Sequence, residues 1–416
     1  MASTPAAVRP RLTSLDQFRG YTMFGMLLVN FLGGYAVCPK ILKHSHDYCS
    51  YADTIMPQFL FAAGFAMRLS LGRRMEAGGH MPWGRAVRRI LGLALVAIAW
   101  YSFCDLHGVI ERFSKEDTVK VLLGLAKRGW FQTLMHIAVT SLWILPVIVA
   151  PARVRVAYAI LSAGLHIGLS WWFNFHWVNA DPSGIDGGPL GFLTWAVPAL
   201  CGTLACDAVR ASGVAATGRL ALSGLLVMLL GWVMTIPTTL YNYELHDETP
   251  ASALYAENHT TELKPRPLPK HEKLAPDPVF PSLSRLQNWD GTLVEPPFVP
   301  PPNSTKRQWN YWMMSQRCGN LAYPTFAAGV SLLIYAGFLW ACDGMGWRLG
   351  LFRTLGTNSL AAYILHDVAG WIMSWVDLFP EKTSTGLMAA AAFACFTLIV
   401  YAGCRTLEAL GWYIRV

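Results

Sequence analysis

The sequence predicts an all-α, polytopic membrane protein: a bundle of about ten transmembrane helices with one long extracytoplasmic insertion. Of its 416 residues, 54% are hydrophobic and only 14% are charged, whereas soluble domains usually carry about 25% charged residues. Apolar runs of roughly 20 residues, the length needed to cross a bilayer, recur along most of the chain. They lie near 14–37, 52–71, 85–105, 129–150, 154–174, 189–209, 217–237, 318–342, 355–377 and 385–407.

These runs divide the chain into four parts. Residues 1–13 are polar and are expected to form a cytoplasmic tail, and 14–237 to hold transmembrane helices 1–7. Residues 238–317 are rich in proline and polar residues and are expected to form the extracytoplasmic insertion, before helices 8–10 in 318–416. If the N-terminus is cytoplasmic and the spans alternate, most Lys and Arg residues outside the insertion fall in cytoplasmic loops. We therefore predict that both termini are cytoplasmic, in the inner membrane if the source is a bacterium.

Composition also bears on partners. The net charge of +8 does not indicate nucleic-acid binding, because the basic residues sit in short loops beside the spans and form no continuous patch. No CxxC or HExxH spacing is present, so no metal is expected. Cys38 and Cys49 flank the first outside loop, where a disulfide would be possible. Membrane lipid is an expected partner, and the sequence leaves a homodimer open.

Ionisable groups inside spans are costly, so each is a functional hypothesis by default. Arg19 and Asn30 lie on one stripe of the first span. The loop that follows holds His44 and His46 ahead of Asp53. An imidazole there is a candidate general base or nucleophile, with a solvated loop histidine as the plain alternative.

Two later spans also carry polar residues. Gln132 and His136 are four apart and share a helix face at the start of the fourth span. The ninth span opens on Asn358, and Ser359, Tyr363 and His366 follow it at helical spacing. Hydrogen bonds between helices are the structural alternative for both sets. The segment 174–188, with Asp181 and Asp186 before a Gly-Gly pair, indicates a tight turn.

The same motifs, taken in order, resemble those of the heparan-alpha-glucosaminide N-acetyltransferase family of transmembrane acyltransferases. The matching segments are Leu15-Asp-Gln-Phe-Arg-Gly20, Lys43-His44, Ala52-Asp53, Arg128-Gly-Trp-Phe-Gln132, Gly191-Phe-Leu-Thr194 and Gly356-Thr-Asn-Ser-Leu360. Two features depart from the family pattern. Ser45-His-Asp-Tyr stands where the family has Ala-x-Trp, and the insertion at 238–317 is longer than the family's usual connection.

The resemblance implies transfer of an acetyl group from cytoplasmic acetyl-CoA, a co-substrate, to an amino sugar or related glycan acceptor on the extracytoplasmic side. His44 matches the family's catalytic histidine best, with His46 as a competitor and Asp53 beside them. The residues expected to line the substrate and acetyl-CoA pocket are Arg19, Asn30, Gln132, His136, Asn358, Ser359, Tyr363 and His366. Two alternatives remain: a transporter or flippase of a sugar-like substrate, and an O-acetyltransferase of the cell envelope.

Overall fold

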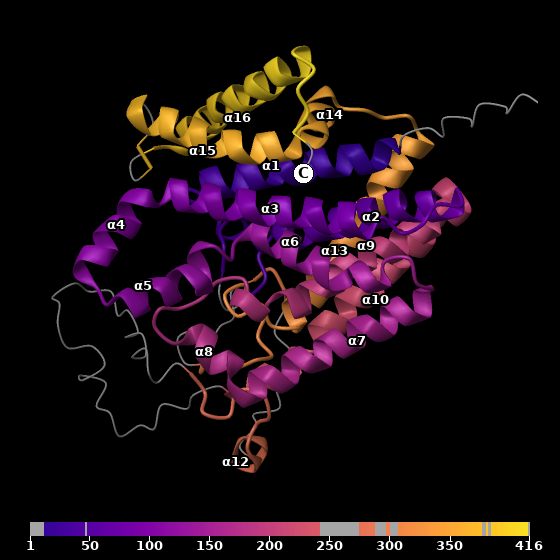
Figure 1. Cartoon of the computed structure of the whole chain (residues 1–416). Helices are drawn as coiled ribbons and strands as arrows, with labels where there is room; N and C mark the ends of the chain where they lie inside the picture. The colour runs from indigo at the N-terminus through magenta and orange to yellow at the C-terminus, as the bar shows by residue number, and fades with distance from the viewer. Residues whose placement is uncertain are drawn as a thin grey trace, which may run out of the picture. The chain divides into compact units, whose positions relative to one another are not determined.

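The computed structural model describes residues 12–45, 48–241, 274–287, 297–299, 307–376, 380–381 and 384–414. The described residues are 76% helical and contain no strand, only an isolated bridge between Leu274 and Trp309. The predicted all-α class is therefore confirmed (Figure 1).

The helices follow one another along the chain. They are α1 (Thr13–Leu32), α2 (Ile55–Glu76), α3 (Trp83–Cys104), α4 (Leu106–Lys115), α5 (Thr118–Gly124), α6 (Thr133–Ile144), α7 (Ala152–Leu169), α8 (Phe175–Asn179), α9 (Phe192–Ser212), α10 (Thr217–Val233), α12 (Leu283–Gln287), α13 (Ala322–Phe338), α14 (Gly350–Thr357), α15 (Ser359–Val376) and α16 (Gly386–Ala409). Shorter 3₁₀ and π-helical segments extend several of them, among them η2 (Ala52–Thr54), η3 (Leu125–Gly129), η7 (Gly213–Ala216) and η8 (Ile236–Tyr241).

Six helices in the described part of the chain are long and apolar enough to cross a membrane. They are Ala52–Glu76, Trp83–Cys104, Ala152–Asn179, Gly188–Tyr241, Ala322–Gly344 and Gly386–Ala409. The pair Thr118–Gly129 and Thr133–Val147, bent by 74°, would make a seventh if it forms one span. These helices fit a membrane protein, but the count of ten spans is not confirmed. One reason is that the expected spans 189–209 and 217–237 fall in one helical run, Gly188–Tyr241.

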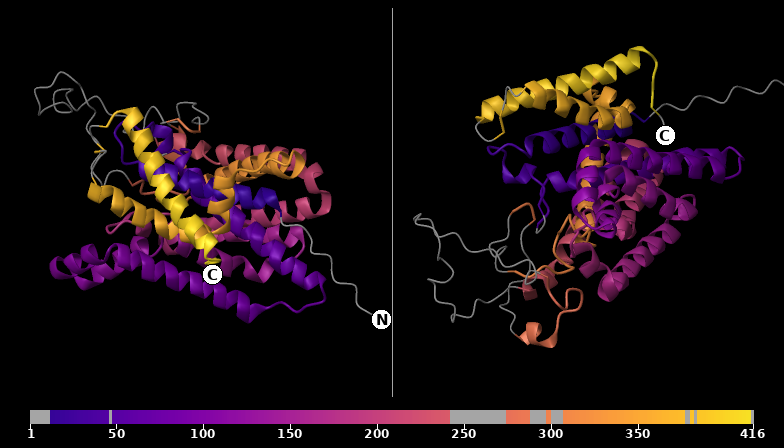
Figure 2. Two further views of the ribbon diagram at one scale, coloured as in Figure 1. Left: turned by 90° about the horizontal axis from the view of Figure 1, so that it is seen from above. Right: turned by 60° about the vertical axis from the view of Figure 1, so that its left-hand side comes forward.

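The described chain divides into two compact units. The first comprises Met1–Val37, Ala208–Ala221 and Leu333–Arg415. In it α1 packs against α14, α15 and α16, which the views of Figures 1 and 2 show side by side. A Cβ on Gly20 would lie 1.8 Å from the Phe352 carbonyl oxygen, and one on Gly356 would lie 2.1 Å from that of Asp16. The glycines of the Leu15–Gly20 and Gly356–Leu360 motifs therefore allow α1 and α14 to touch backbone to backbone.

The second unit comprises Cys38–Asp207 and Leu222–Leu332. A pair of glycines brings α2 and α9 close together there. A Cβ on Gly64 would lie 2.0 Å from the Ala199 carbonyl oxygen, and a Cβ on Gly202 would lie 2.0 Å from that of Phe61. Small residues at such crossings let membrane helices approach closely. This contact fixes the relative position of two helices whose N-terminal ends carry the candidate site.

The described parts of the predicted insertion contain one short helix, α12, and they are anchored to the second unit. Arg285 pairs with Asp277 at 2.8 Å and lies over the Tyr241 ring. The Tyr241 hydroxyl donates to the Asp277 carbonyl at 2.6 Å. Tyr311 is fully buried, with its hydroxyl 2.7 Å from Nδ1 of His166 in α7. The described segments 274–287 and 307–317 therefore pack against the second unit, because both contribute side chains to a buried apolar cluster. The extracytoplasmic location assigned to the insertion stays a prediction.

Candidate functional site

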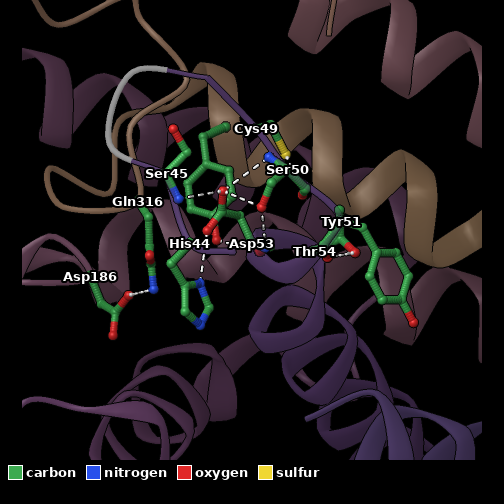
Figure 3. Close-up of polar contacts among 10 residues, drawn as sticks. His44, Ser45, Cys49, Ser50, Tyr51, Asp53, Thr54, Asp186 and Gln316 are labelled. Atoms are coloured by element: carbon green, nitrogen blue, oxygen red, sulfur yellow. Dashed lines mark hydrogen bonds and ion pairs between the residues drawn. The ribbon is translucent and has the colours of Figure 1, made fainter. Parts of the chain in front are cut away.

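The loop before α2 brings together two of the predicted catalytic residues. The His44 Nδ1 atom lies 2.9 Å from Oδ1 of Asp53 (Figure 3). Asp53 is buried in η2, which leads directly into α2, whereas 40% of the His44 side chain is exposed. His46 lies outside the described residues. Cys38 and Cys49 are free thiols, so the disulfide considered from the sequence is not formed.

A reciprocal set of hydrogen bonds fixes the orientation of the Asp53 carboxylate. Its Oδ2 accepts from the backbone N–H and the hydroxyl of Ser50, both at 2.9 Å, and from the Ser45 N–H at 3.3 Å. The Ser50 hydroxyl in turn accepts from the Asp53 N–H at 3.3 Å. This is the pattern of a capping box, with Asp in the acidic position. The sequence Ser50-Tyr-Ala-Asp53 carries the signal for Ser50, which the sequence analysis missed.

This geometry sets the tautomer of His44. Because an ionised carboxylate only accepts hydrogen bonds, the neutral imidazole of His44 carries its proton on Nδ1 and keeps the lone pair on Nε2. Nε2 points away from Asp53 (Figure 3), and no described residue forms a hydrogen bond with it. Burial lowers the pKa of His44, but the hydrogen bond to Asp53 and the charges of Asp53 and Asp186 outweigh it and raise the pKa above its ordinary 6.5. An oriented imidazole of this kind can act as a general base or a nucleophile.

A second carboxyl group, that of Asp186, interacts electrostatically with His44, and the Gln316 side chain stands between the two in Figure 3. Asp186 is 5% exposed and adopts a left-handed φ of 55°, ahead of Gly187 at 81° and Gly188 at 59°. Its Oδ1 accepts from Nε2 of Gln316 at 3.3 Å, and its backbone carbonyl accepts from the Trp195 indole at 2.8 Å. Burial raises the pKa of Asp186 to about 7.

Hydrogen bonds connect the turn of Asp186 and Gly187 to the turn of Arg317 and Gly319. The Gly187 N–H donates to the Arg317 carbonyl at 3.1 Å, and the Thr194 hydroxyl donates to the Gly319 carbonyl at 2.7 Å. A Cβ on Gly191 would lie 2.3 Å from the Asp186 carbonyl oxygen, so a side chain there would displace the turn. The Gly191-Phe-Leu-Thr194 motif therefore supports the Asp186 turn.

Tyr323, in the first turn of α13, binds the backbone of Asp53. Tyr323 is buried, and its hydroxyl donates to the Asp53 carbonyl at 2.5 Å. Its ring meets that of Trp195 edge-on at 5.5 Å. Tyr323 and Trp195 thus connect the segment of His44 and Asp53 to the segment of Asp186.

Gln132 and His136 lie near this cluster but differ in what they contact. His136 is fully buried between Phe131 and Trp195, at ring distances of 5.7 and 6.2 Å. Among the described residues, neither of its ring nitrogens has a hydrogen-bond partner. The Gln132 amide instead donates to the nearby Gly129 carbonyl at 3.1 Å. Their assignment to an acetyl-CoA pocket stays a prediction.

The other six predicted pocket residues belong to the first unit, where they form separate contacts. The Arg19 guanidinium donates to the Ser359 hydroxyl at 2.7 Å. Asn358 holds the end of the chain: its amide donates to the Trp412 carbonyl at 3.0 Å and accepts from the Ile414 N–H at 3.2 Å. Asn358 therefore binds the backbone of residues 412–414, a structural role that its motif did not predict.

His366 and Tyr363 are neighbours, as their spacing predicted. Their rings are 5.2 Å apart, and Nδ1 of His366 contacts the Tyr363 carbonyl oxygen. Nε2 of His366 lies 3.4 Å from Oδ1 of Asp367. Asn30 is exposed in the last turn of α1. Nothing in these contacts assigns Asn30, Tyr363 or His366 to a ligand.

Comparisons with models of protein families and with curated proteins found no match to this chain. Within the described residues, no group of three or more His, Cys, Asp or Glu side chains is arranged to hold a metal ion. The function is therefore argued from the chemistry of the His44 site.

We expect Asp53→Asn to lower the pKa of His44, because the variant loses the negative charge and the acceptor that raise it. Diethyl pyrocarbonate modifies only neutral imidazole, so the modification rate of the His44 peptide, read by mass spectrometry against pH, measures this pKa. The reactivity of the wild-type protein should rise at a pH above 6.5, and that of the variant at a lower pH. Exposed His80 provides the reference in the same sample. Identical profiles for His44 in the two proteins would contradict the dyad.

Proposed function

We propose that this protein is a transmembrane acyltransferase that moves an acetyl group from cytoplasmic acetyl-CoA to an amino sugar or related glycan on the extracytoplasmic side. The observation that carries the proposal is the dyad of His44 and Asp53, in which Asp53 holds Nδ1 and 40% of the His44 side chain is exposed. The apolar helices and the ordered motifs that resemble transmembrane acyltransferases support it. Both termini are placed in the cytoplasm, as the distribution of basic residues favours.

In the direct route, Nε2 of His44 removes a proton from the attacking amine as the C–N bond forms. The C–S bond then breaks, and the CoA thiolate takes the proton back from the imidazolium. Asp53 stabilises the imidazolium and holds the ring in place, as the carboxylate of a catalytic triad does. In the alternative route, Nε2 attacks the thioester itself, CoA leaves, and the amine then takes the acetyl group from the imidazole. The geometry accommodates both routes.

The test uses purified protein in sealed vesicles with acetyl-labelled acetyl-CoA on the cytoplasmic side and a panel of amine and hydroxyl acceptors. We expect free CoA and an acetylated amino sugar in stoichiometric amounts. A transporter or flippase would move the sugar and leave acetyl-CoA intact, whereas a cell-envelope O-acetyltransferase would label hydroxyl acceptors. Absence of acetyl-CoA consumption with every acceptor would overturn the proposed function.

A further inference from the structure

Asp186 is a buried carboxyl group that the proposed reaction does not yet use. It interacts electrostatically with His44, with the Gln316 side chain between them in Figure 3, and a strained turn holds it there. Its Oδ1 is bound by Gln316, whereas no described residue forms a hydrogen bond with its Oδ2. A non-glycine residue with left-handed φ is uncommon, and such strain is found at functional sites. The turn therefore holds the carboxyl group within electrostatic reach of the His44 imidazole.

Groups from several elements act on the Asp186 carboxyl. The groups that act on its carboxyl are His44 in the loop before α2, Asp53 in η2, Arg128 in η3, and Gln316 in the loop before α13. Tyr323 in α13 also interacts with it electrostatically. Burial outweighs the cationic neighbours and brings the pKa of Asp186 to about 7, so the carboxylate forms close to neutral pH.

An amine acceptor makes a demand that a hydroxyl acceptor does not. Near neutral pH an aliphatic amine is an ammonium ion, which cannot attack a thioester until it loses a proton. It loses a second proton as the C–N bond forms. His44 has a single free nitrogen and can accept only one of them.

We infer that Asp186 takes the first proton from a cationic amine acceptor, and that His44 takes the second. This inference rests on the proposed acetyl transfer. The ammonium ion gives one proton to the Asp186 carboxylate and becomes a neutral amine. The amine nitrogen attacks the thioester carbon, and Nε2 of His44 accepts the second proton. The C–S bond breaks, the thiolate takes that proton from His44, and Asp186 releases the other to water, so one proton is released per acetyl group transferred.

The test is Asp186→Asn. Asparagine tolerates the left-handed backbone of this turn and has nearly the same shape, but it cannot accept a proton. We expect kcat/KM for amine acceptors to fall about 100-fold, the scale of a lost general base. The fall should appear between about pH 7, where the Asp186 carboxyl is half ionised, and the pKa of the amine. Above the pKa of the amine the acceptor is already neutral, and the variant should approach the wild-type rate.

Two amines of different basicity make the test specific. The pH at which the defect disappears should follow the pKa of each amine, which a structural defect would not do. Asp181→Asn, an exposed aspartate in the same segment that pairs with Lys120, is the matched control and should behave as wild type. A defect of Asp186→Asn that is the same at every pH and for both amines would overturn the inference. Failure of the wild-type protein to transfer acetyl to any acceptor would overturn the proposed function itself.

Discussion

Replacing His44 with alanine is expected to lower acetyl transfer by roughly 10²–10⁴-fold, the contribution of a positioned general base. The reason is that His44 has a partly exposed side chain, and that its Nδ1 is held by Asp53 while Nε2 faces away from that carboxylate (Figure 3). The measurement is the rate of labelled acetyl transfer per folded protein in vesicles. Acid quenching of the wild-type protein during turnover separates the two routes, since only the second leaves label on His44.

His80→Ala is the matched control for this substitution, because His80 is exposed in the connection between α2 and α3. It should keep the full rate. His46→Ala should have a smaller effect than His44→Ala. If His46→Ala is inactive and His44→Ala is active, the catalytic histidine has been assigned to the wrong member of the loop.

The second large effect is expected from Gly202→Val in α9. A Cβ at this position would lie 2.0 Å from the Phe61 carbonyl oxygen in α2, where only backbone stands in its way. The helices must separate to admit a side chain, and overpacking a tight contact costs about 1–3 kcal/mol or more. We expect a lower thermal midpoint in detergent. Activity should fall further than the loss of folded protein, since α2 and α9 follow directly from the Asp53 and Asp186 segments.

Gly164→Val in α7 is the control for this change, because no atom lies within 4 Å of a Cβ built there. It adds the same side chain to a membrane helix and should leave the midpoint nearly unchanged. Equal midpoints for Gly202→Val and wild type would show that the α2–α9 crossing can relax, and would contradict the close contact described here.

The parts of the candidate site that sequence reasoning found are local. His44 and Asp53 are nine residues apart, and Ser50 completes a capping box within the same turn, so one short stretch encodes the dyad. The positions of the longer helices also followed from apolar runs. The number of spans did not, because hydropathy marks apolar length but not where a run breaks, bends or continues through a 3₁₀ turn.

What the sequence did not disclose depends on distant contacts. Gln316 meets Asp186 across 130 residues, and Tyr323 meets Asp53 across 270. No pattern in the sequence around either residue of these pairs predicts the other residue as its partner. Likewise, a single sequence does not distinguish Gly202, packed against a backbone, from Gly164, which faces open space. Asn358 was expected in a pocket, and its bonds to the chain end emerge only when residues 412–414 return to it.

The bond between Tyr323 and Asp53 also bears on how the protein matures in the cell. The dyad lies near the start of the chain, and its hydrogen bonds form within ten residues, so it can assemble as soon as this loop leaves the ribosome. Gln316 and Tyr323 are synthesised only after most of the spans and the whole proline-rich segment. Residues synthesised long after Asp53 therefore close the surroundings of an early-formed dyad. A nascent chain would carry an oriented histidine long before the rest of its site, and the finished surroundings would appear only once Tyr323 has been made.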